Sequence, residues 1–165
     1  MAEIKKNSLQ TVILEGWHGG GAIFIFPATG TEKDKWPWDA DLPEIFSVYH
    51  EPALFRSILI KHYDPELPGN KERSQGHYDD YGPNFYKKET VLRMIEEMLD
   101  NLEQVRRMPI DEQSKRLSCS YRNDTEEDLL MRIEEEKDFT ERFAERLRGL
   151  VLNTPGQDYI CVNGP

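Results

Sequence analysis

The chain has 165 residues, of which 38% are hydrophobic and 32% charged, and these values predict a single globular domain spanning residues 1–165. Its formal net charge of −10 repels phosphate backbones and anionic lipid surfaces, which argues against nucleic-acid and membrane partners. No apolar run approaches the roughly 18 residues of a membrane span, and the first ten residues lack the apolar region of an export signal, so we expect a cytoplasmic protein.

Strands are predicted mainly in the first half of the chain. Residues 8–15 are rich in β-branched side chains and end at a glycine, as a strand does. Residues 22–26 form a second apolar run after a glycine-dense segment, so the two runs predict a hairpin. Because the second run is apolar on both faces, we expect a central strand or one covered on both sides. Residues 28–43 are interpreted as a loop, and residues 44–49 as a third strand or one helical turn.

Residues 52–63 are ambiguous. Alternation of apolar and polar side chains toward the end of this segment fits a strand, and we prefer a strand over residues 56–63. The competing interpretation is a helix with four apolar residues on one face: Leu54, Phe55, Ile58 and Leu59. Residues 64–83 then form a long polar loop, and loops of that length often carry function.

The clearest pattern in the sequence is a helix expected from about residue 85 to residue 108. Asn84 is the expected N-cap, and Pro109 ends the helix because its ring clashes with the preceding turn. The other side of this helix is charged and suits solvent. Apolar residues recur along one face at spacings of three and four: Val91, Leu92, Ile95, Met98, Leu99, Leu102 and Val105.

A second long helix is expected over residues 124–152, because its start combines cap residues with early acids that suit the helix dipole. Residues 110–122 are short and mixed, and residues 159–162 could return as an edge strand. Strands first and long helices later predict an α+β fold. We expect a small, mostly antiparallel sheet covered on one face by the two long helices.

Few motifs point to catalysis. The segment HGGG at residues 18–21 matches the oxyanion loop of some esterases, but the chain has no GxSxG nucleophile elbow. We therefore interpret it as a glycine-rich hairpin loop. The sequence has no P-loop, Rossmann fingerprint, HExxH or EF-hand loop, and no cofactor is expected.

A His/Asp set defines an alternative function. The tripeptides HYD at residues 62–64 and 77–79 each place a histidine and an aspartate two positions apart, so on a strand both would point the same way. Imidazole and carboxylate ligands suit zinc or iron. The alternative hypothesis is therefore a small metal-dependent hydrolase, with four candidate ligands: His62, Asp64, His77 and Asp79.

Two further sets of residues are assigned structural roles. Cys119 and Cys161 would pair only in an oxidising compartment, and Cys119 is expected to be a buried structural cysteine. The acidic runs of the long helices are interpreted as solvated faces. Glu136 is the exception, because it lies close to the apolar stripe and needs either a partner or a bend in the helix.

The preferred hypothesis is a non-enzymatic protein-binding module of the immunity or inhibitor type that recognises a basic partner. Two tryptophans around a proline form an aromatic anchor beside two acids, and tyrosines with aspartates in the 64–83 loop suit a basic surface. The apolar stripe of residues 91–105 also leaves room for a homo-oligomer. The expected binding residues are Trp36, Trp38, Asp39, Asp41, Tyr78, Asp79, Asp80 and Tyr81.

Overall fold

The computed structural model describes residues 23–28, 46–48, 51–73, 76–119 and 125–164. Within these residues, four strands form one antiparallel sheet in the order β2-β1-β4-β3. The strands are β1 (Ile23–Ala28), β2 (Phe46–Val48), β3 (Pro83–Lys87) and β4 (Tyr159–Asn163). The helices are α2 (Ala53–Lys61), α3 (Pro68–Arg73), α4 (Lys88–Arg106), α5 (Ile110–Arg116) and α6 (Glu126–Leu152). The predicted α+β fold with an antiparallel sheet is confirmed.

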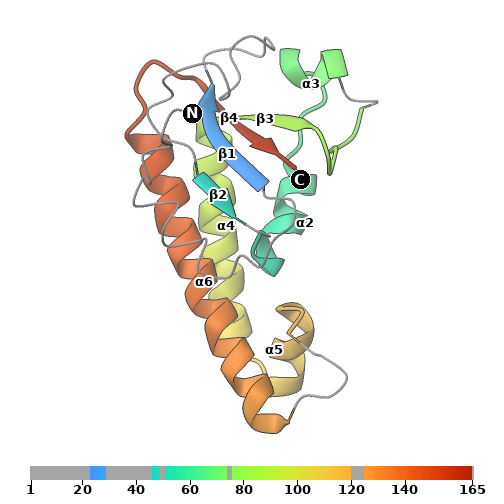
Figure 1. Ribbon diagram of the computed structural model, residues 1–165, viewed down its shortest axis with the longest axis vertical. Coiled ribbons are helices and arrows are strands. Elements are labelled where there is room, and N and C mark those ends of the chain that lie inside the picture. Colours follow the sequence, from blue (N-terminus) through green and yellow to red (C-terminus); the bar gives the residue numbers. More distant parts are fainter. Residues whose placement is uncertain (1–22, 29–45, 49–50, 74–75, 120–124, 165) are drawn as a thin grey trace, which may run out of the picture.

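The two long helices set the shape of the molecule. In Figure 1, α4 and α6 run side by side, and the sheet lies across the upper part of this pair. Helix α2 packs on α4 beside the sheet, whereas α5 lies at the lower end of the pair. Both long helices are therefore on the same side of the sheet, as expected. Within the described residues, no helix has the length and apolar character needed to cross a membrane.

Alternation along the strands divides the apolar side chains between two clusters. On the helix side, strand residues join the main core with the stripe of α4 and with α2 and α6. These strand residues are Ile23, Ile25, Tyr86, Ile160 and Val162. The intervening positions form a second buried cluster of Phe26, Ala28, Phe85 and Cys161. Strand β1 is therefore buried on both faces and lies between β2 and β4, which confirms the prediction of a central strand.

The predicted strand over residues 56–63 is wrong, because this segment belongs to helix α2. Helical spacing brings four apolar side chains onto one buried face, and among them Phe55 packs against Phe143 of α6 with ring centroids 5.0 Å apart. The exposed Ile60 produced the misleading alternation. The four buried residues are Leu54, Phe55, Ile58 and Leu59.

The first long helix begins later than predicted. Residues 83–87 form β3, which pairs with β4, and Lys87 rather than Asn84 is the N-cap of α4. Asn84 is fully buried in the strand, where its amide bonds backbone groups. Because β3 takes the outer position, β4 lies inside the sheet, which corrects the predicted edge strand.

The remaining elements refine the prediction. Helix α3 lies within the segment predicted to be a loop, and α5 occupies the mixed segment after Pro109. Residues 46–48 adopt the strand rather than the helical turn. Helix α6 is confirmed, with a capping box between Thr125 and Asp128. The predicted strand over residues 8–15 and its glycine loop lie outside the described residues.

Candidate functional site

Four of the predicted binding residues lie together in the turn that leads into β3, which we call the 78–82 turn. The end of the chain packs directly against it: a Cβ at Gly164 would lie 1.8 Å from the carbonyl oxygen of Asp80. A Cβ at Gly82 would lie 2.3 Å from Oδ2 of Asp79. Glycine at both positions therefore permits a close packing that no other residue allows without a shift of backbone or side chain.

The buried amide of Asn84 holds the backbone of this turn. Its Oδ1 accepts a hydrogen bond from the Asp79 N–H at 2.9 Å, and its Nδ2 donates to the Asp79 carbonyl at 2.7 Å. The same Nδ2 lies 3.2 Å from the Gly82 oxygen and 3.3 Å from the Val162 oxygen. In turn, Asp79 Oδ1 accepts from the Tyr81 N–H at 3.0 Å. The backbone of the turn is therefore tied to β4 through Asn84.

Tyr78 connects the turn to the core. Its half-buried ring meets Tyr63 edge-on at a centroid distance of 6.2 Å, and Tyr63 meets Tyr86 in the same way at 6.4 Å. The Tyr86 hydroxyl donates to the Leu59 carbonyl at 2.7 Å. Burial, and then the nearby carboxylate of Glu51, raises the pKa of Tyr78, so its phenol stays neutral. Tyr78 therefore joins the turn to the aromatic residues of the core and remains partly exposed.

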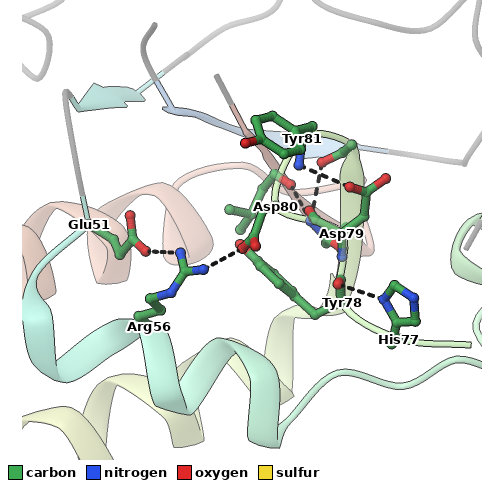
Figure 2. A network of polar contacts seen from close by, with 10 residues as sticks. Glu51, Arg56, His77, Tyr78, Asp79, Asp80 and Tyr81 are labelled. Carbon is green, nitrogen blue, oxygen red and sulfur yellow. Dashed lines mark hydrogen bonds and ion pairs between the residues drawn. The ribbon is translucent and has the colours of Figure 1, made fainter.

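Asp80 and Tyr81 are the residues of the turn that face solvent. Arg56 of α2 lies between two carboxylates, with Nη2 2.7 Å from Asp80 Oδ1 and Nη1 3.0 Å from Glu51 Oε1 (Figure 2). The hydrogen bond to Glu51 is the main cause that raises the pKa of Arg56. The Asp80 side chain is still 48% exposed, and Tyr81 is 80% exposed.

The electrostatic environment of the turn is negative. Besides burial, the carboxylates of Glu51, Asp80 and Asp79 raise the pKa of Tyr78, whereas the Arg56 guanidinium lowers it. Three carboxylates against one guanidinium leave an excess of negative charge around Tyr78, at the base of the turn that carries Tyr81. Such a surface attracts cationic groups.

Sequence reasoning identified the turn but not the residues that support it. Arg56 lies in a segment predicted to be a strand, and Asn84 was predicted to cap a helix. The contact of Arg56 depends on how α2 is placed. Asn84 lies close in sequence to the turn groups that it bonds, but its place in a strand depends on the pairing of β3 with β4. Trp36, Trp38, Asp39 and Asp41 lie outside the described residues.

The candidate metal ligands have other contacts. His62 Nε2 lies 2.6 Å from Glu97 Oε2, beside a pocket of about 190 Å³ that Asp64 also lines. Asp64 Oδ1 accepts from the Glu66 N–H at 2.9 Å, and His77 Nδ1 lies 3.0 Å from the Tyr78 carbonyl oxygen. Across the described ranges, no three His, Cys, Asp or Glu residues form a group able to hold a metal ion.

The cysteines and Glu136 have structural surroundings. Both cysteines are free and buried, with Cys119 in the main core and Cys161 in the cluster on the other side of the sheet. Burial raises the pKa of the Cys119 thiol to about 11, which makes it a poor nucleophile. Glu136 does have a partner: its Oε1 accepts from the Ala53 N–H at 3.0 Å and so caps the start of α2.

No protein-family model, curated protein or solved structure matches this chain.

Proposed function

We propose that this protein is a non-enzymatic binding module of the immunity or inhibitor type, which recognises a basic protein partner through the 78–82 turn. The observation that carries the proposal is Tyr81, a large aromatic side chain 80% exposed on a turn that a buried amide holds in place. Exposed aromatic residues are frequent energetic centres of protein interfaces. A turn that is already ordered loses little conformational entropy on binding, so more of the contact energy remains as affinity.

Charge supports a basic partner. The formal net charge is −10, and Asp80, the neighbour of Tyr81 in the chain, shares the single guanidinium of Arg56 with Glu51, which leaves local negative charge at the turn. This distribution would accelerate the encounter with a positive surface. A lysine or arginine of the partner would contact the face of the Tyr81 ring and share the Asp80 carboxylate with Arg56.

The experiment compares proteins captured from a lysate of the source organism by immobilised wild type and by the Tyr81→Ala variant. Because the ring is exposed, the variant should keep its fold, which circular dichroism checks. We expect the wild type to retain a basic protein at low salt, with less retained as salt rises. The immobilised Tyr81→Ala variant should not retain this basic protein.

Met131→Ala is the matched control, since Met131 is an exposed apolar residue of α6 and is 54% exposed. It should retain the same protein as the wild type. Equal capture by the wild type and Tyr81→Ala would contradict the proposal, because it would show attraction by charge alone.

A further inference from the structure

A second surface lies on the side of α4 that faces away from its buried stripe. It is an open groove of about 820 Å³, bounded by α2 on one side and by the end of α6 on the other. Two leucines line it, and one of them, Leu152, is 63% exposed. The remaining residues that line it are Lys61, Arg93, Glu96, Glu97, Asp100, Asn101, Gln104 and Arg148.

The charges of this groove balance, unlike those of the whole chain. Three cations and three anions line it, whereas the chain as a whole carries −10. Two acids are already paired across the helices: Lys61 Nζ lies 2.6 Å from Glu97 Oε1, and Arg148 bonds Glu96. A net-neutral surface with exposed leucine has little attraction for a basic partner. It also lacks the excess negative charge that would repel a second copy of the chain.

Two charges in the groove remain unmatched. Within the described part of the chain, neither Arg93 nor Asp100 forms an ion pair, and Arg93 donates only to the Thr90 hydroxyl, at 3.3 Å. The two residues are seven positions apart, which is close to two helical turns, so they lie on the same side of α4.

We propose that this groove binds a second copy of the chain, with the two α4 helices antiparallel about a twofold axis. A twofold axis that passes between residues 96 and 97 exchanges position 93 with position 100, so Arg93 of each copy faces Asp100 of the other. The acids nearest the axis, Glu96 and Glu97, already form ion pairs with Arg148 and Lys61 of their own chain. Leu92 and Leu152 then provide the apolar area of the contact.

This interface differs from the one suggested by the sequence. The stripe of Val91, Ile95, Met98, Leu102 and Val105 is buried in the chain's own core and is unavailable to another copy. The proposed contact instead uses the groove side of α4, which shares with the predicted stripe only Leu92, a partly buried residue at its edge. It is also independent of the 78–82 turn, so the two proposals fail or succeed separately.

Light scattering after size exclusion tests the proposal. We expect the wild type to have about twice the chain mass of 19.3 kDa. Arg93→Asp and Asp100→Arg should each give monomers. In a dimer of either variant, both contacts between positions 93 and 100 would join like charges. An equimolar mixture of the two variants should recover the dimer mass, since both contacts then join opposite charges.

Recovery on mixing excludes misfolding as the reason for the loss. Asp111→Arg, the same charge reversal at an exposed residue of α5, is the matched control and should remain a dimer. A wild type with the monomer mass at every concentration would overturn the proposal. Single variants that remain dimers, or a mixture that stays monomeric, would overturn it as well.

Discussion

At the scale of single residues, two buried asparagines organise the region around the candidate site. Asn84 bonds the 78–82 turn, as described above. Asn70 of α3 is also fully buried, and it accepts from the Phe85 N–H at 2.8 Å and donates to the Phe85 carbonyl at 2.9 Å. This amide therefore pairs with the outer edge of β3 as a neighbouring strand would. It occupies an edge that would otherwise be open to pairing with another chain.

We expect Asn84→Ala to destabilise the fold. The substitution leaves the Asp79 N–H and carbonyl without their buried partner, and one unsatisfied buried polar group costs about 1–3 kcal/mol. Guanidinium unfolding measures the change. Asn153→Ala, which removes an exposed amide at the end of α6, is the control and should change stability much less. Equal losses in the two variants would show that the buried amide has no special role.

Cys119 provides a second prediction at this scale. Its pKa of about 11 implies that at pH 8 only about one thiol in a thousand is ionised. We expect iodoacetamide to modify this cysteine about tenfold or more slowly in the native protein than in guanidinium. Peptide mapping by mass spectrometry assigns the modified site without a substitution. Similar rates in the two states would indicate an accessible, activated thiol.

At the scale of elements, contacts between helices replace local capping signals. Helix α2 has no side-chain cap of its own, and Glu136 of α6 bonds its first N–H instead. At the other end of α2, Lys61 and His62 both bond the carboxylate of Glu97 on α4, each at 2.6 Å. Helix α2 is thus tied to α6 at its start and to α4 at its end.

The Glu97 contact predicts a dependence of stability on pH. The hydrogen bond from Lys61, and then that from His62, lowers the pKa of Glu97 below its ordinary value of 4.5. Because the pKa of Glu97 is lower in the folded state than in the unfolded state, its ionised carboxylate stabilises the fold at pH values above the unfolded-state pKa. This contribution is lost as the pH falls through the folded-state pKa. Glu97→Gln should therefore be less stable than the wild type at pH 7, by at most about 1 kcal/mol for each exposed pair.

The difference between Glu97→Gln and the wild type should shrink as the pH falls below the ordinary glutamate pKa of 4.5 and through the lowered folded-state pKa. Thermal unfolding at several pH values measures it. Glu145→Gln alters an exposed carboxylate of α6 that forms no ion pair with another described residue, so it should track the wild type throughout. A gap between Glu97→Gln and the wild type that stays constant with pH would contradict the assignment.

At the scale of the whole molecule, the two ends of the α4–α6 pair differ in their surroundings. At one end the pair carries the sheet and α2, whereas α5 lies at the other (Figure 1). Helix α5 is short, and most of its side chains are exposed. Two of its residues, Gln113 and Ser114, are buried. The end with the sheet therefore contains more of the cooperative core.

Amide hydrogen exchange should follow this asymmetry. We expect amides of α5 to exchange through local opening, at free energies well below those of β4 and the middle of α4, because few apolar contacts hold α5 in place. Exchange followed by mass spectrometry in native buffer measures the difference. If α5 is as protected as β4, the described domain opens as one cooperative unit.

Elements whose signals are local could be predicted from the sequence. The stripe of α4 and the capping box and dipole of α6 lie within single helices, and the apolar run of β1 marks a buried strand wherever it is placed. Composition and order then sufficed for an α+β fold. The 78–82 turn was identified as well, since its tyrosines and aspartates are adjacent in the chain.

Elements whose partners are distant in the chain could not be predicted in this way, and their conformation depends on tertiary contacts. Residues 83–87 extend the helical segment in sequence, but pairing with β4 and the bonds of Asn84 make them a strand. The apolar residues between positions 52 and 63 are compatible with both a strand and a helix, and residues 53–61 form a helix whose Phe55 packs against Phe143. The contact of Arg56 with Asp80 likewise follows from the placement of α2 beside the turn. Local sequence cannot encode such contacts, because their free energy arises only when separate elements meet.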